Sequence, residues 1–279
     1  MNDYKNINLR NTIVEFSTYN NKKIILCGTH NNRLECFFNN LNKNNNYSNK
    51  SFNNCVIIKC YKDQKVKFKM IYEGETYDGK QNNTKSLCKS TNKCWDIISF
   101  NNYFDNYSFD NYINLPNDTE IFFIRHGLGI HNKMNILQKI INTNKDSELD
   151  AIGIEQSKRV GIFLKGYFTN FYKNIIIKYV ASHLIRTQQT IAEIMKGLQK
   201  IDIIYIIPCI HEISFSNNCD TSLINKIQPS SNIPNCTNNE GTCNKLNDIE
   251  INWDYYSEFY KLNKKCQDTN IINEIIKVI

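Results

Sequence analysis

Arg125-His126-Gly127 follows a short apolar run, Ile121–Ile124, near the middle of the chain. An apolar run that ends in glycine-flanked polar residues is typical of a buried parallel strand reaching the ligand-binding edge of an α/β sheet. A histidine at such an edge can attack phosphorus, and an adjacent arginine can hold a phosphoryl group with paired hydrogen bonds. Gly127 lets the backbone approach a ligand closely. These residue types therefore predict phosphoryl transfer with His126 as the nucleophile.

Three later segments also place polar residues at the ends of predicted strands or helices. Leu149–Gln156 opens a predicted helix, Tyr179–Thr190 contains a Ser-x-x-x-Arg-x-x-x-Thr spacing, and Cys209–Ile213 carries Glu212. With Arg125-His126-Gly127, these segments occur in the order of the histidine phosphatase (phosphoglycerate mutase-like) superfamily, which the chain resembles. The resemblance implies a three-layer α/β/α sandwich with a mixed, mostly parallel sheet.

The resemblance also implies a role for each matching residue. His126 would form a phosphohistidine, Arg125 and Arg186 would hold the phosphate oxygens, and Asn132 would donate a further hydrogen bond. Glu212 would protonate the leaving oxygen and later activate water. The family's chemistry requires no metal and no cofactor. Arginine is scarce in this chain, yet it stands at both family phosphate positions, where lysine cannot copy a bidentate contact.

The family needs a second histidine, on a late strand after the acidic residue, but no histidine follows His211. His30 offers a replacement at the other end of the chain. It follows an apolar run, Lys23–Cys27, and precedes apolar residues with helical spacing. Those residues are Leu34, Phe37, Phe38 and Leu41. This order resembles the family's late strand, histidine and helix.

We therefore interpret the chain as one circularly permuted histidine phosphatase domain. Residues 1–75 resemble the family's C-terminal third, including a closing hairpin in which Val66, Phe68 and Met70 alternate with lysines. Residues 76–117 are a connector, and residues 118–279 resemble the family's N-terminal two thirds. The alternative is that residues 1–75 form an unrelated unit and the catalytic half is inactive.

The permutation makes two geometric predictions. The strand Ile24–Cys27 should lie in the same sheet as Ile121–Ile124. The nearest ring nitrogens of His30 and His126 should be within roughly 6 to 7 Å, because both must reach one phosphoryl group.

Composition narrows the class of protein. The 279 residues carry a net charge of +7, spread over lysines rather than clustered with aromatic residues, so we expect no nucleic-acid partner. No apolar run approaches the ~18 residues of a membrane span, and no secretory leader is present. Despite eleven cysteines, we therefore expect a cytoplasmic protein with reduced thiols. The sequence leaves the oligomeric state open.

The predicted function is hydrolysis of a phosphomonoester, with a phosphorylated small molecule or a phosphoprotein as substrate. Mutases of the family follow the acidic residue with Arg-His-Tyr-Gly, whereas Ile213-Ser214-Phe215 follow Glu212, so mutase activity is less favoured. The irregular stretch 217–247 is the expected specificity insertion. A catalytically inactive phosphate-binding or scaffold protein of the same fold remains the alternative.

Overall fold

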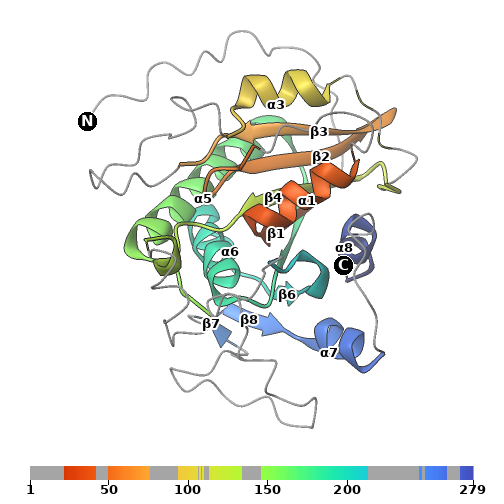
Figure 1. The fold of residues 1–279 in the computed structure, drawn as a ribbon. Coiled ribbons are helices and arrows are strands. Elements are labelled where there is room, and N and C mark those ends of the chain that lie inside the picture. The colour runs from red at the N-terminus through yellow and green to blue at the C-terminus, as the bar shows by residue number, and fades with distance from the viewer. Residues whose placement is uncertain are drawn as a thin grey trace.

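The computed structural model describes residues 22–41, 50–75, 94–105, 107, 109, 113–133, 146–212, 245–246, 249–262 and 271–278. Within these residues lies one eight-stranded sheet with the strand order β3-β2-β4-β1-β5-β6-β8-β7 (Figure 1). Its strands are β1 (Lys22–Thr29), β2 (Ile57–Asp63), β3 (Lys65–Tyr72), β4 (Thr119–Arg125), β5 (Ile175–Ala181), β6 (Ile204–Ile206), β7 (Lys245–Leu246) and β8 (Ile249–Asn252).

The sheet is mixed and mostly parallel, as predicted. β4, β1, β5, β6 and β8 pair in parallel, whereas β3-β2, β2-β4 and β8-β7 pair antiparallel. The described helices are α1 (Asn31–Leu41), α3 (Ile97–Phe104), α5 (Ala151–Phe171), α6 (Ile185–Leu198), α7 (Asp254–Lys261) and α8 (Ile271–Val278), with 3₁₀ turns η2 (Ile130–Lys133) and η3 (Pro208–Ile210).

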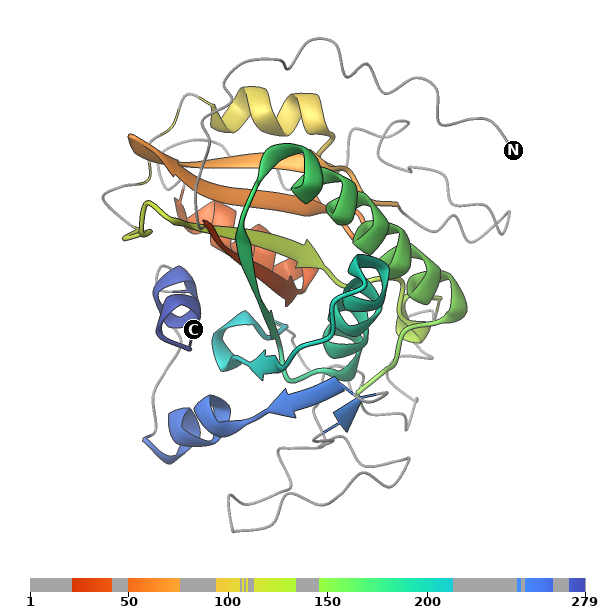
Figure 2. The ribbon, with the colours of Figure 1, turned by 180° about the vertical axis from the view of Figure 1, so that it is seen from behind.

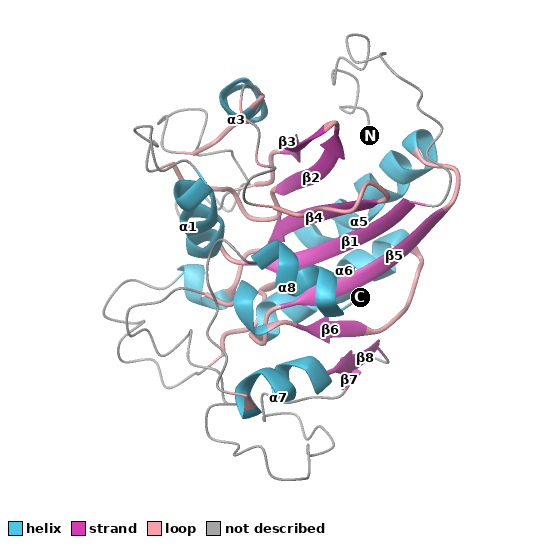
Figure 3. Cartoon of the chain, turned by 90° about the vertical axis from the view of Figure 1, so that its right-hand side faces the viewer, coloured by secondary structure: helices cyan, strands magenta, loops and turns pink. Residues whose placement is uncertain are grey.

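Helices cover both faces of the sheet, which gives the predicted three-layer α/β/α sandwich. α5 and α6 lie on one face, whereas α1 and α8 lie on the other (Figures 2 and 3). The alternating side chains of β1 join the two cores. Ile24 and Leu26 pack with α5 and α6, and Ile25 and Cys27 pack with α1 and α8. Because both faces of β1 are buried, its sequence is a continuous apolar run.

β1 lies at the centre of the sheet, between β4 and β5. Its register pairs Thr29 with Arg125 and Gly28 with Ala181. The prediction that Ile24–Cys27 lies in the same sheet as Ile121–Ile124 is confirmed. This arrangement carries the residue after β1, His30, to the ends of two strands that come much later in the chain.

The predicted hairpin and part of the predicted connector form regular secondary structure. β2 and β3 form an antiparallel pair in which Val66, Phe68 and Met70 are fully buried. α3 lies within the predicted connector, and its Phe100 and Phe104 join the core beside β3. Residues 76–93 of the connector lie outside the described residues, as does most of the predicted specificity insertion, 217–247.

The cysteines correct one expectation. Cys27, Cys36, Cys55 and Cys60 are free, but Cys94 and Cys209 are disulfide-bonded. The prediction of reduced thiols is therefore wrong at these two positions, because it rested on the inferred compartment and on no local feature of either cysteine. None of the helices in the described part of the chain has the length and apolar character that crossing a bilayer requires.

Candidate active site

The carboxyl ends of three neighbouring parallel strands bring the candidate residues together. His30 follows β1, Arg125 ends β4 and Ser182 follows β5. Because these strands are paired in register, the residues after them meet at one edge of the sheet, where ligands bind in open α/β folds. His126 follows Arg125 directly, and its backbone N–H donates to the Thr29 carbonyl over 3.0 Å.

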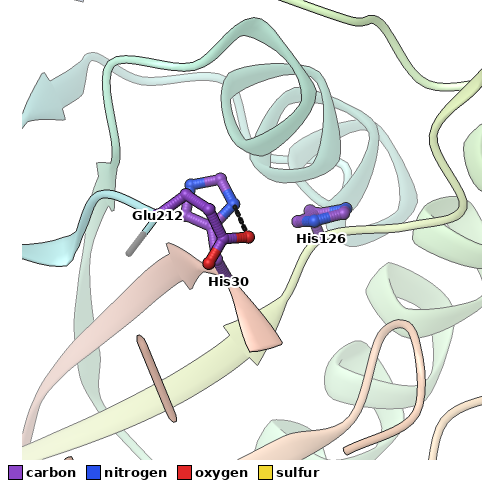
Figure 4. A group of neighbouring side chains, drawn as sticks. All are labelled: His30, His126 and Glu212. Carbon is purple, nitrogen blue, oxygen red and sulfur yellow. Dashed lines mark ion pairs between the residues drawn. The ribbon is translucent and has the colours of Figure 1, made fainter. Parts of the chain in front are cut away.

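His30, His126 and Glu212 form the centre of this site (Figure 4). The two imidazole centroids are 5.2 Å apart. One ring nitrogen of each histidine and one Glu212 carboxylate oxygen all lie within 4.8 Å of one another. The separation predicted for the two histidines, roughly 6 to 7 Å or less, is therefore met. Both imidazoles are almost fully buried.

The hydrogen bonds of His126 fix its tautomer. Nδ1 lies 2.7 Å from the Gly127 carbonyl oxygen, which can only accept, so Nδ1 carries the proton. Nε2 lies 3.3 Å from Arg186 Nε, which can only donate. Both contacts leave the lone pair on Nε2, so Nε2 is the ring nitrogen available for nucleophilic attack. Burial, with Arg186 and Arg125 next, lowers the pKa of His126 and keeps the ring neutral.

Arg186 places a fixed positive charge inside the site. It lies in the first turn of α6, is completely buried, and its Nη2 is 3.7 Å from Glu212 Oε2. Because burial and Arg186 lower the pKa of His30 as well, the site's cationic groups are its arginines rather than its histidines.

Arg125, at the end of β4, is held by the segment that contains Phe52. Its Nη1 donates to the Phe52 carbonyl oxygen, while its buried Nε has no hydrogen-bond partner among the described residues. Burial lowers the pKa of Arg125 to about 10, so the guanidinium stays charged at neutral pH. A buried N–H donor without a partner is costly, and a bound anion would satisfy it.

Glu212 reaches the site differently from the prediction. β6 ends at Ile206, and the 3₁₀ turn Pro208–Ile210 separates it from Glu212, so the acid is not at a strand tip. Proline at the start of this turn favours the change of direction. The Glu212 carboxylate lies 3.5 Å from His30 Nδ1, the contact drawn as a dashed line in Figure 4.

Gly127 and Asn132 have local packing roles that the sequence did not reveal. A Cβ atom at Gly127 would lie 2.5 Å from the Gly153 carbonyl oxygen, so glycine lets the Arg-His-Gly tip pack against α5. Asn132 Oδ1 accepts the Gly129 N–H over 2.8 Å and shapes the loop after the tip. Their contacts with substrate remain predictions.

Sequence reasoning missed Ser182 as the hydrogen-bond partner of His30, and Thr187 as the partner of Ser182. Ser182 Oγ lies 2.7 Å from His30 Nε2 and 2.9 Å from Thr187 Oγ1. An ionised Glu212 only accepts hydrogen bonds, so the proton of a neutral His30 then lies on Nδ1, and Nε2 accepts from Ser182. The sequence places Ser182 and His30 at the ends of predicted strands that meet at one edge, but it does not specify a hydrogen bond between residues 152 positions apart.

His30, His126 and Glu212 also have a spacing from which a divalent cation could be bound, with two ring nitrogens and one carboxylate oxygen. The buried guanidinium of Arg186 decides against this use. It lies within 4 Å of both His126 Nε2 and Glu212 Oε2, so an entering cation would meet a fixed charge of the same sign. The electrostatics of the site favour an anion.

Comparison with known proteins finds one family that matches part of the chain. Residues 121–224 match the family model described as the histidine phosphatase superfamily (branch 1). The matched segment contains His126, Arg186 and Glu212 but not His30. No curated protein and no solved structure matches the chain. The match does not reach residues 1–75 and so does not bear out the circular permutation, which stays a prediction.

Proposed function

Because residues 121–224 match the histidine phosphatase superfamily, we propose that this chain hydrolyses phosphomonoesters through a phosphohistidine on His126. The observation that carries the proposal is the fixed tautomer of His126. Its proton is held on Nδ1 by the Gly127 carbonyl, and its Nε2 lone pair faces the buried Arg186 guanidinium. A neutral imidazole beside a fixed cation is suited to attack an anionic phosphoryl group.

The first step transfers the phosphoryl group to the protein. His126 Nε2 attacks phosphorus as the bond between phosphorus and the ester oxygen breaks. Protonated Glu212 gives its proton to the departing oxygen, so the product leaves as an alcohol. Glu212 is suitably located, because its carboxylate lies within 4.8 Å of the reactive histidine.

The charge of the transferring group is stabilised by groups that are already in position. Arg186 and Arg125 supply two guanidinium groups, and His30 supplies the N–H on Nδ1 while its Nε2 accepts from the Ser182 hydroxyl. That nitrogen is 3.5 Å from Glu212 and makes no short hydrogen bond within the described residues, so phosphate can accept from it. The buried arginines need no reorganisation when charge develops.

The second step releases inorganic phosphate. Glu212, now ionised, accepts a proton from water as the water oxygen attacks the phosphohistidine. The nitrogen–phosphorus bond breaks, the electron pair returns to His126 Nε2, and Glu212 is protonated for the next turnover. No metal or cofactor takes part in either step.

The proposal also covers the class of substrate, the cellular location and the circular permutation of the domain. The substrate is a phosphorylated small molecule or a phosphoprotein, and the protein is cytoplasmic with no nucleic-acid or membrane partner. Residues 1–75 complete a circularly permuted domain of which His30 is the second histidine. The permutation is supported by the central place of β1 in the sheet, which brings the ring centroids of His30 and His126 to within 5.2 Å of each other.

A single-turnover assay tests the proposal. With a ³²P-labelled aryl phosphate, the wild-type protein should acquire an acid-labile label at His126 and release labelled phosphate. His126→Ala should acquire no label, and Glu212→Gln should release phosphate much more slowly. Release of phosphate by His126→Ala at the wild-type rate would contradict the proposal. Phosphate binding without turnover would instead favour an inactive phosphate-binding protein.

A further inference from the structure

The segment Thr29–Arg33 makes three contacts with the segment that ends at Glu212. Thr29 Oγ1 donates to the Ile210 carbonyl oxygen over 3.1 Å, and Arg33 Nε donates to the His211 carbonyl oxygen over 3.0 Å. His30 Nδ1 lies 3.5 Å from the Glu212 carboxylate itself. Three consecutive residues, Ile210 to Glu212, are thus held by one short stretch at the end of β1 and the start of α1.

Arg33 is a well-fixed member of this group. It lies in the first turn of α1 and is only 5% exposed, on the same face as Leu34 and Phe37. The helix begins directly after His30, whose carbonyl oxygen accepts the Leu34 N–H over 3.1 Å. The planar guanidinium directs its Nε–H along one line, so the contact with His211 fixes direction as well as distance.

The hydrogen bond from Arg33 to the His211 carbonyl oxygen restrains the direction of the Glu212 side chain. The His211 carbonyl belongs to the peptide unit that joins His211 to Glu212, so a hydrogen bond to its oxygen restrains the orientation of that unit. The direction in which the Glu212 side chain leaves the backbone follows from that orientation. His30 contacts the far end of the same residue, because its Nδ1 lies 3.5 Å from the Glu212 carboxylate.

We propose that Arg33 is a positioning residue for the proton donor Glu212. It holds the peptide before Glu212 so that the carboxyl group meets the leaving oxygen of the substrate. This inference rests on the proposed function. A merely structural Arg33 would affect folding and all substrates alike, whereas a positioning residue affects substrates according to how much they need a proton from Glu212.

The test uses a series of aryl phosphates from p-nitrophenyl through phenyl to p-methoxyphenyl phosphate. The nitrophenolate ion leaves readily without protonation, whereas p-methoxyphenolate needs the proton. General acid catalysis contributes on the order of 10²-fold or more. We expect Arg33→Met to lower kcat/KM, which reports the step in which the aryl group leaves, about tenfold more for p-methoxyphenyl than for p-nitrophenyl phosphate, in the same direction as Glu212→Gln.

Further variants separate positioning from folding. Arg33→Lys keeps a charged donor on a stem of similar length and should restore part of the loss with p-methoxyphenyl phosphate. Thr29→Val removes only the contact with Ile210 and should show the same leaving-group pattern if Arg33→Met does not fold. Arg159→Met is the matched control, because Arg159 is a half-exposed arginine of α5 that pairs with Glu75. Its leaving-group dependence should equal that of wild type.

The outcomes are distinct. A leaving-group dependence that steepens in Arg33→Met and Thr29→Val, but not in Arg159→Met, supports the inference. An equal loss across the series contradicts the role of Arg33 and leaves the proposed function intact. A wild-type protein that hydrolyses none of the series overturns both.

Discussion

His30 Nε2 lies 2.7 Å from Ser182 Oγ, a buried contact between residues 152 positions apart in the chain. It joins the end of β1 to the end of β5. Ser182 in turn lies 2.9 Å from Thr187 Oγ1 in the first turn of α6, the helix that carries Arg186. The orientation of the His30 imidazole is therefore set by the segment that also supplies the buried guanidinium.

Replacing Ser182 tests this relationship. Ser182→Ala leaves His30 Nε2 buried without its partner, so we expect a loss of about 1–3 kcal/mol in the free energy of unfolding. We also expect a lower kcat, because His30 is freer to rotate. Urea unfolding and an assay well below the unfolding temperature measure the two effects. Thr187→Ser keeps a hydroxyl beside Ser182 and should retain activity, whereas an active, fully stable Ser182→Ala would contradict the assignment.

Arg186 should not tolerate lysine. Its Nε reaches His126 and its Nη2 lies beside Glu212, and a single ammonium cannot occupy both places. We expect Arg186→Lys to lower kcat/KM on the order of 10²-fold, comparable to losing one donor to the transition state. Arg159→Lys, at a half-exposed ion pair between α5 and Glu75, should leave kcat/KM unchanged. Near-normal activity of Arg186→Lys would show that charge alone suffices.

Acid should destabilise the fold through its buried histidines. Burial, followed by His211 and Arg186, lowers the pKa of His183 to about 3, from about 6.5 in an unfolded chain. Below pH 6.5 the unfolded state therefore binds a proton that the folded state excludes. Stability falls with decreasing pH by up to about 1.4 kcal/mol per pH unit for this residue.

His183→Gln removes this one titration and should flatten the curve of unfolding free energy against pH between about pH 6 and 4. Urea titrations of wild type and variant at several pH values measure the difference. The comparison cancels the contributions of His30 and His126, whose pKa values are lowered in the same direction. Parallel curves for the two proteins would mean that His183 is protonated in the folded state.

Two glycines should respond to alanine with opposite signs. At Gly127 a Cβ atom would lie 2.5 Å from the Gly153 carbonyl oxygen, so Gly127→Ala should cost about 1–3 kcal/mol and displace the His126 tip from α5. At Gly166 in α5 no atom lies within 4 Å of the same position. Gly166→Ala should stabilise the protein by about 0.5–1 kcal/mol, because alanine favours the helix. Thermal unfolding distinguishes the two, and a neutral Gly127→Ala would remove the packing argument.

Local patterns predicted the parts of the fold that depend on local physics. The apolar run before Arg125 and the helical spacing from Leu34 to Leu41 each correspond to an observed element, β4 and α1. In both elements the buried side chains are apolar and recur with the spacing of the element, and a short stretch of sequence is enough to show that spacing. The place of His30 beside His126 was also predictable, because both follow apolar strands and parallel strands meet at one edge.

Features set by contacts between distant segments could not be predicted. Ser182 contacts His30 only because β1 and β5 are neighbours in the sheet. The residues of neither segment determine which strands become neighbours. The 3₁₀ turn before Glu212 was missed because Cys209–Glu212 was compared with a strand end. The oxidation of Cys94 and Cys209 depends on partners and surroundings that residue spacing does not define.

The central position of β1 has a consequence for how the chain is made. The ribosome synthesises β1 well before its two neighbours in the sheet, β4 and β5. Both edges of this apolar strand therefore stay unpaired until those two strands have been made. Pairings between distant segments slow folding, and exposed apolar edges favour aggregation in the meantime. The last β1 pairing to become possible, with β5, also brings Ser182 to His30. The pairing that encloses β1 on both edges is thus also the one that orients the His30 imidazole.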